Sequence, residues 1–327
     1  MGWKQCILRP ALCVVMTVLV GPAAAAQAGF SYRGICDASA AVALGAEHFV
    51  VADDERNTLR IFQRNNPDAV GEVDLREFLG TKKGRESDLE GAAVIGQRIY
   101  WIASHGRNSK GKERPERYRF FATDIVSGKS PTVVPVGSVY TGLLRDLAGA
   151  AHLNSAGLAQ AAARAPEDEG GLNIEGLAAS AEGKLLIGFR SPVPGGRALI
   201  VPLENPEGII RGEAARLGAP VLLDLAGRGI RSIELLGSAH IVAAGPAADS
   251  GAFALYRWSG ASREDKPVKL GNIDLSDLRP EALFAIPGGR QMQILSDDGG
   301  VQAGGMPCKD QKPSRQSFRS LVIELAP

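Results

Sequence analysis

Residues 172–190 read LNIEGLAASAEGKLLIGFR, in which one apolar segment opens on Glu175 and a second ends in Arg190. Residues 181–183 between the two segments, Ala-Glu-Gly, are typical of a turn, so this stretch predicts two antiparallel strands. Four other stretches repeat the pattern. Their acidic openings lie at 35–38, 89–92, 233–236 and 280–283, and their second segments end at 53–54, 104–107, 245–246 and 296–298. Internal repeats of this kind are typical of solenoids, propellers and arrays.

Each repeat can be divided into four short strands. In the third repeat we expect them at 175–179, 184–189, 197–203 and 220–225. Four strands per unit is the blade of a β-propeller. The last repeat contains only three strands, whereas an unassigned strand-like segment, 30–33, precedes the first repeat. The sequence therefore predicts an all-β propeller of five four-stranded blades, with six as the alternative count, whose ring is closed by the N-terminal strand so that no sheet edge stays open.

One segment departs from the strand pattern. Residues 142–170 are rich in Ala and Leu, and their apolar positions are spaced as in helices. We expect a short helical insertion here, which either covers the rim of the propeller or acts as a lid. Residues 29–327 are otherwise expected to form a single domain.

The first residues have the features of an exported protein. Lys4 and Arg9 precede an apolar run at 11–20, and a small-residue run ends in Ala26-Gln27-Ala28. This pattern predicts a signal peptide over residues 1–28 and a periplasmic or secreted product. A lipoprotein is less well supported, because Cys13 lies inside the apolar run. No later segment is apolar enough to span a membrane.

Cys36 and Cys308 are the cysteines that remain after this cleavage. A single pair in an exported protein predicts a disulfide, with two buried thiols as the alternative. The bond would join the first repeat to the last, which are neighbours in a closed ring. The net charge of +1 argues against a general nucleic-acid partner.

The repeat brings charged side chains together. In a propeller, the first strand of each blade lines the central channel, and its start meets the end of the second strand at one mouth. One acid per blade is therefore expected around the channel, namely Asp37, Glu90, Glu175, Glu234 and Glu281. A second set is expected just outside it, namely Asp53, Asp54, His105, Arg107, Arg190, Asp297 and Asp298. Carboxylates converging on one axis repel one another, so a compensating charge is expected.

A hard cation such as Ca²⁺ is the simplest compensation, because it takes six to eight oxygen ligands in irregular geometry. The candidate ligands are Asp37, Asp53, Glu90, Glu175, Glu234 and Glu281. Two alternatives stay open. Arg33, Arg190 and Arg279 could form salt bridges with these acids, or each carboxylate could accept backbone N–H groups from the next blade and so hold the ring together.

The stretch 101–108, WIASHGRN, contains the best candidates for catalysis. His105, at the end of a strand, could act as a general base or a ligand, and a surface histidine is the alternative. Arg107 and Arg190 are candidates to clamp a bound anion. The sequence contains no nucleophile elbow, zinc-protease helix, phosphate-binding loop or C-x-x-C pair, so hydride transfer and zinc proteolysis are disfavoured.

Several of these stretches carry a resemblance. Residues 33–40 (RGICDASA), 88–93 (DLEGAA), 100–108 (YWIASHGRN), 172–178 (LNIEGLA) and 188–190 (GFR) resemble bacterial proteins grouped as domain-of-unknown-function family 3616. The resemblance covers nearly all of the mature chain and implies no established activity. The E-G-L/A openings are also similar, more loosely, to esterase-like phytase propellers, which implies metal-assisted phosphoester chemistry. Glu90 and Glu175 match that opening in full, whereas Glu234 and Glu281 lack the glycine.

Three functions follow from these observations. The first is an exported propeller that binds a small or anionic ligand at its acidic mouth, together with a divalent metal, Ca²⁺ being the candidate. The second is a metal-dependent phosphoesterase or esterase with His105 as base. The third is a scaffold that binds another protein of the cell envelope.

Overall fold

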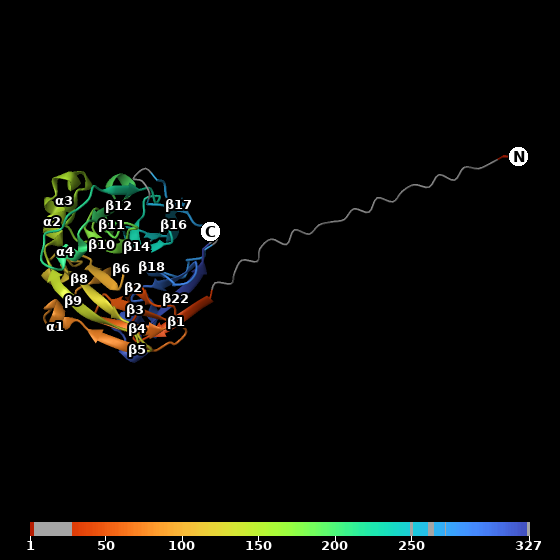
Figure 1. Ribbon diagram of the computed structural model, residues 1–327, viewed down its shortest axis with the longest axis horizontal. Helices are drawn as coiled ribbons and strands as arrows, with labels where there is room; N and C mark the ends of the chain where they lie inside the picture. Colours follow the sequence, from red (N-terminus) through yellow and green to blue (C-terminus); the bar gives the residue numbers. More distant parts are fainter. Residues whose placement is uncertain (3–27, 249–250, 261–264, 272, 326–327) are drawn as a thin grey trace.

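Five antiparallel sheets of four strands each are arranged around a central axis (Figure 1). This computed structural model describes residues 1–2, 28–248, 251–260, 265–271 and 273–325. It confirms the five-bladed, all-β propeller predicted from the repeat. The expected signal peptide lies almost entirely outside the described residues. No helix in the described parts of the chain is long and apolar enough to cross a membrane.

The blades follow one another along the chain. Blade one consists of β2 (Ala38–Leu44), β3 (His48–Asp53), β4 (Thr58–Gln63) and β5 (Ala69–Asp74). Blade two consists of β6 (Leu89–Ile95), β7 (Arg98–Ala103), β8 (Phe120–Val126) and β9 (Thr132–Tyr140). Blade three consists of β10 (Asn173–Ala179), β11 (Leu185–Ser191), β12 (Ala198–Leu203) and β13 (Val221–Leu223). Blade four consists of β14 (Gly229–Leu236), β15 (Ala239–Gly245), β16 (Ala254–Trp258) and β17 (Val268–Lys269). Blade five consists of β18 (Pro280–Ala285), β19 (Gln291–Ser296), β22 (Ser317–Glu324) and β1 (Ala28–Arg33).

The N-terminal strand closes the ring, as expected. β1 pairs antiparallel with β22, with Tyr32 opposite Phe318. Tyr32 is buried, and its ring lies 5.0 Å from that of Phe49 in blade one and 5.3 Å from that of Phe318. Such aromatic pairs contribute about 0.5–1.5 kcal/mol beyond their buried area. The predicted disulfide between Cys36 and Cys308 joins the same two blades.

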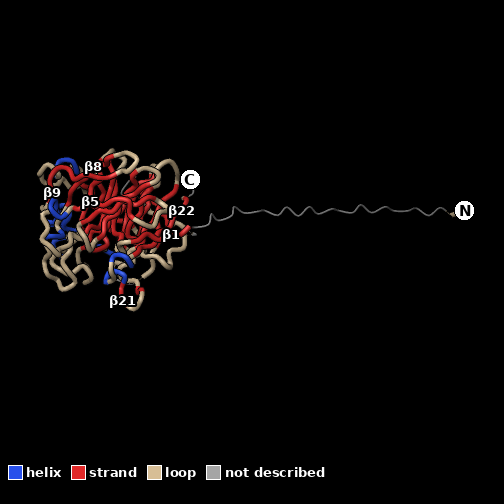
Figure 2. Tube along the Cα trace, turned by 90° about the horizontal axis from the view of Figure 1, so that it is seen from below, coloured by secondary structure: helices blue, strands red, loops and turns tan. Residues whose placement is uncertain are grey.

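The short helices lie at the periphery (Figures 1 and 2). α2 (Leu143–Gly149), η2 (Ala151–Ala156) and α3 (Leu158–Ala161) lie between blades two and three in the sequence. Their buried leucines join the apolar cluster formed by those two blades. α1 (Arg76–Leu79) and α4 (Pro206–Ile209) connect strands elsewhere. η1 (Pro115–Arg117), η3 (Pro194–Gly196), η4 (Cys308–Asp310) and η5 (Pro313–Arg315) are single 3₁₀ turns, and a small hairpin, β20 (Gln302–Ala303) and β21 (Met306–Pro307), precedes η4.

The first strands of the blades form a continuous inner ring, in which β2, β6, β10, β14 and β18 each contact the next and β18 contacts β2. Neighbouring inner strands approach closely. A Cβ atom on Gly91 would lie 2.8 Å from Ile102 Cγ2 and 3.1 Å from the backbone nitrogen of Leu177 in the next blade. The glycine of the E-G motif is therefore required by this close approach between blades.

Candidate functional site at the channel mouth

Every inner strand carries a β-bulge near its start. In each case one residue is skipped in the pairing with the second strand. The skipped residues are Ser39, Glu90, Glu175, Arg231 and Glu281. A bulge redirects a side chain relative to the regular alternation of the strand, so these five positions are structurally equivalent.

This register corrects the expected placement of Glu234. β14 begins at Gly229, so Arg231 rather than Glu234 occupies the equivalent position in blade four. Glu234 lies further along the strand, opposite Ile241, and its Oε1 accepts a 3.3 Å hydrogen bond from the backbone N–H of Ala285. Burial raises the pKa of Glu234 to about 7. Its carboxylate thus links blade four to blade five.

Arg231 compensates two of the predicted acids. Its Nε lies 2.9 Å from Glu175 Oε2 in blade three, and its Nη2 forms an ion pair with Glu281 in blade five. Glu175 also receives a 2.9 Å hydrogen bond from Asn173 and lies 3.2 Å from Nη1 of Arg190. These carboxylates are therefore engaged by residues of the chain itself.

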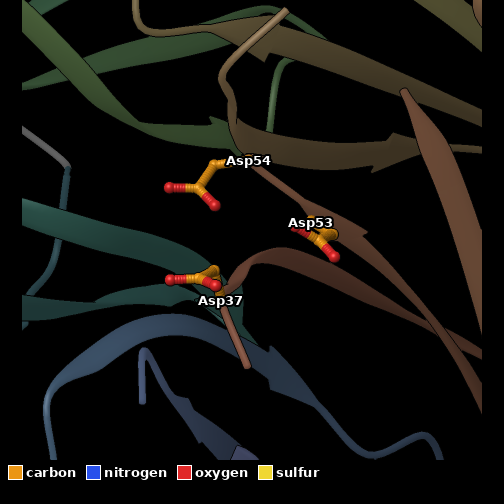
Figure 3. A group of neighbouring side chains, drawn as sticks. All are labelled: Asp37, Asp53 and Asp54. Carbon is orange, nitrogen blue, oxygen red and sulfur yellow. The ribbon is translucent and has the colours of Figure 1, made fainter. Parts of the chain in front are cut away.

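A second group of acids is not compensated in this way. One carboxylate oxygen of each of Asp37, Asp53 and Asp54 lies within 4.8 Å of the others (Figure 3). The same holds for Asp54, Asp88 and Glu90. Asp54 belongs to both groups and joins them. We call these five residues the acidic cluster.

Local structure places these side chains. Asp53 ends β3 opposite Ala38, and its Oδ1 accepts the backbone N–H of Glu55 at 3.0 Å. Asp37 forms an isolated bridge with Asp297 of blade five. Asp88 directly precedes β6 with a left-handed φ of 57°, which is costly for a residue with a side chain. Strain of this kind is typical of functional sites.

The electrostatics of the acidic cluster are unfavourable for five free anions. Burial, with the nearby Asp297 carboxylate, raises the pKa of Asp37 to about 8, and burial raises the pKa of Asp53 to about 6. Burial together with neighbouring acids holds the pKa values of Asp54 and Glu90 well above their usual range.

The countercharges near the acidic cluster are few. Arg117 Nη1 lies 2.9 Å from Asp88 Oδ2, and Arg56 Nε lies 3.7 Å from Asp53 Oδ2. The Oδ1 atom of Asp54 is buried and has no hydrogen-bond partner among the described residues. An unpaired buried carboxylate oxygen is costly, and the cost is relieved either by a proton or by a cation, which these oxygens could hold.

A cavity of about 450 Å³ opens beside the acidic cluster. It is lined by Asp37, Asp53, Glu55, Arg56, Lys309, Asp310 and Gln316. Lys309 follows the disulfide-bonded Cys308, and its Nζ lies 2.8 Å from Glu55 Oε1. The same loop of blade five lies against Asp37, because a Cβ on Gly299 would fall 1.5 Å from Asp37 Oδ1.

His105 is not a member of the acidic cluster. His105 is buried, donates from Nδ1 to the Ala103 carbonyl at 2.7 Å, and stacks on Tyr118. Burial, with Arg119 nearby, lowers the pKa of His105 to about 4, so the ring is neutral. Its Nε2 is enclosed and has no partner among the described residues.

The two predicted clamp arginines are both paired with groups of the chain, and only Arg190 lies at the mouth. Arg107 donates to the carbonyl oxygens of Ala162 and Gly111 and pairs with Glu113 at 2.8 Å. Arg190 reaches the mouth, where it pairs with Glu175. Asp298 is also occupied, by two hydrogen bonds from the Arg319 side chain and one from its backbone.

Sequence reasoning missed Asp88, Arg231 and Lys309. Asp88 could have been found, because it lies two residues before the bulge residue Glu90, as Asp37 lies two before Ser39. Arg231 carries the opposite charge to its equivalents, so a search for recurring acids passes over it.

A larger cavity, of about 840 Å³, lies between blades two and three at the turns away from the mouth. Its lining includes Arg98, which pairs with both Asp124 and Glu207. Because these charged groups compensate one another, the acidic cluster remains the better candidate site.

The fold and the mouth define a class, that of five-bladed β-propellers with an acidic, oxygen-rich site at one end of the channel. Within that class, the chain belongs to the family described as protein of unknown function DUF3616, whose model matches residues 37–121 and 137–293. This confirms the resemblance seen in the sequence. No curated protein is significantly similar to the chain.

Solved structures share the fold at low identity. The major allergen Mala s 1 of Malassezia sympodialis is 9% identical, with a TM-score of 0.52 over 91% of this chain and 96% of that one. The PQQ-bound aldose sugar dehydrogenase of Streptomyces coelicolor is 12% identical, with a TM-score of 0.42 over 90% of this chain and 99% of that one. The likeness to Mala s 1 concerns the fold alone.

Proposed function

We propose that the protein is a ligand-binding propeller that holds one divalent cation in the acidic cluster, with Ca²⁺ as the best match. The observation that carries the proposal is Asp54, whose carboxylate joins two groups of three acids and whose buried Oδ1 lacks a hydrogen-bond partner among the described residues. A cation at this position would supply the missing interaction for Asp54.

The donor set supports a hard cation. All five members of the acidic cluster offer carboxylate oxygens, and neither His nor Cys contributes a ligand to either group. Ca²⁺ takes six to eight oxygens in flexible geometry, whereas Zn²⁺ prefers nitrogen and sulfur donors. Five carboxylates leave room for water or for a ligand oxygen.

With a cation offsetting the four carboxylates that line it, the neighbouring cavity would accept a small polar ligand with an anionic group. Charged and amide side chains line it, which disfavours an apolar ligand. Lys309 and Arg56 border it next to Asp37 and Asp53. An anionic group there would complete the coordination of the cation and contact these two basic side chains.

Thermal unfolding with EDTA, and then with Ca²⁺, Mg²⁺ or Mn²⁺ added back, tests the cation. A ligand that binds only the folded state raises the melting temperature with its concentration. We expect a rise with Ca²⁺ in the wild type and none in Asp54→Asn. The exposed Asp68, which pairs with Arg33 at 2.7 Å, provides the control Asp68→Asn, which should respond like the wild type.

Either of two results would overturn the proposal. One is a wild-type melting temperature that no cation changes. The other is an equal response in Asp54→Asn. If the cation binds, titration with inorganic phosphate and with acetate then tests for the anion, whose affinity should require Ca²⁺.

We also propose export, with a mature chain that begins near Gly29. The disulfide supports it, because disulfides persist in oxidising compartments. Mass spectrometry of the N-terminus, together with cell fractionation, tests it; an intact residue 1–28 segment in the cytosolic fraction would refute it. The hydrolase alternative is less well supported, since His105 is enclosed and Arg107 is engaged.

A further inference from the structure

Arg231 occupies the place of a cation at the channel mouth. Its side chain is 7% exposed and lies between one carboxylate from each neighbouring blade, Glu175 in blade three and Glu281 in blade five. The Phe253 ring lies 5.9 Å from its guanidinium carbon. A positive charge is therefore held, largely away from solvent, between two acids.

The equivalence of the bulge positions explains this arrangement. Glu175, Arg231 and Glu281 are the skipped residues of three successive inner strands, so the two acids flank the position from either side. Glu90, at the equivalent position of blade two, is also close enough for its charge to act on Arg231. Without the guanidinium, the Glu175 and Glu281 carboxylates would lose the charge that lies between them, and only Glu175 would keep a basic partner among the described residues, Arg190.

We propose that Arg231 is a built-in cation that masks a second divalent-cation site, formed by Glu175 and Glu281, and so confines metal binding to the acidic cluster. The masked site would take a hard cation such as Ca²⁺, because its ligands are carboxylate oxygens. The inference rests on the proposed function only for the location of the first cation.

A permanent charge at this position has a consequence for ligand exchange. Arginine stays charged and does not dissociate, so blades three, four and five are linked at any cation concentration. The metal at the acidic cluster can then leave without opening this part of the ring. The contacts among blades three, four and five therefore do not depend on whether a metal is bound at the acidic cluster.

The number of bound ions tests the inference. We would measure Ca²⁺ per mature protein by equilibrium dialysis and elemental analysis for the wild type and for Arg231→Met. We expect one additional Ca²⁺ in Arg231→Met, and a return to the wild-type number in Arg231→Met/Glu281→Gln. Arg98→Met is the matched control, because Arg98 also bridges two carboxylates, Asp124 and Glu207, and should leave the number unchanged.

Two results would overturn the inference. The first is an Arg231→Met variant that circular dichroism shows to be folded but that binds the same number of Ca²⁺ ions as the wild type. The second is an Arg231→Met variant that fails to fold in millimolar Ca²⁺, although the triple variant Arg231→Met/Glu175→Gln/Glu281→Gln folds. That result would mean that Ca²⁺ cannot replace the guanidinium between the two carboxylates. If the proposed site at Asp54 is itself wrong, the wild type binds no ion and Arg231→Met binds one, so the two failures are distinguishable.

Discussion

The substitution Glu234→Gln should stabilise the protein at alkaline pH and leave it unchanged in acid. Burial raises the folded-state pKa of Glu234 from 4.5 to about 7. Between these pH values the folded state binds more protons than the unfolded state, so the free energy of unfolding falls as the pH rises and levels off above pH 7. Glutamine cannot lose a proton, and it keeps the acceptor oxygen for the Ala285 N–H.

The size of the effect follows from the shift. Each pKa unit corresponds to about 1.36 kcal/mol, so the full shift sets an upper limit of about 3.4 kcal/mol. Solvent reaches part of the residue and screens the charge, and we therefore expect a gain of about 2 kcal/mol at pH 8. Contributions from other titrating groups cancel in the difference between variant and wild type, provided that they are distant.

Urea unfolding of both proteins from pH 4 to pH 8.5 measures this difference. The exposed Glu182→Gln is the matched control and should show no pH-dependent gain. A difference between Glu234→Gln and wild type that stays constant with pH, or a variant that is less stable at pH 8, would refute the assignment of Glu234 as an acid whose ionisation is disfavoured in the folded state.

Two further predictions concern the closure and packing of the ring. The double substitution Cys36→Ser/Cys308→Ser removes a disulfide that closes a loop of 272 residues, and it should lower the free energy of unfolding by up to about 5 kcal/mol. Urea unfolding measures the loss, with the wild type in reductant as the control. A loss below about 1 kcal/mol would mean that the pairing of β1 is sufficient to close the ring. Gly91→Ala should lower the free energy of unfolding by about 1–3 kcal/mol, because the added Cβ would lie 2.8 Å from Ile102 Cγ2. Gly149→Ala is the control and should leave the stability unchanged, because no atom lies within 4 Å of the added Cβ. Equal effects of the two substitutions would contradict the packing argument.

The sequence predicted the blades because the requirement for close packing is local. The inner strand needs a small residue after the bulge, so the E-G pairs at Glu90 and Glu175 recur visibly along the chain. In blade four the residues Ile233-Glu234 have the same Ile-Glu sequence as Ile174-Glu175 in blade three. The residues at the structurally equivalent position, however, are Ile230-Arg231. An isoleucine precedes both positions, so the pairing register is needed to distinguish them.

The candidate site was less predictable, because it depends on distances between blades. Asp88 and Arg117 are far apart in the sequence, yet their charged atoms lie 2.9 Å apart in the structure. A surface position was the alternative for His105 at the end of a strand, but the side chain is buried and stacks on Tyr118. Such packing is set by the loops, whose paths the repeat does not specify.

The bulge positions of the five inner strands do not all carry an acid, and the two exceptions, Ser39 and Arg231, determine where negative charge gathers at the mouth. If all five bulge positions carried acids, their repulsion would oppose ring closure, and any cation bound on the axis would be shared by all blades. Arg231 replaces one acid and engages Glu175 and Glu281, which leaves the negative charge concentrated on blades one and two. Ser39 replaces another acid and turns its hydroxyl to the Ala52 and Leu89 carbonyl oxygens. The aspartates beside it, rather than the bulge residue itself, thus supply the oxygens of the acidic cluster in blade one, next to the cavity that Lys309 and Arg56 border.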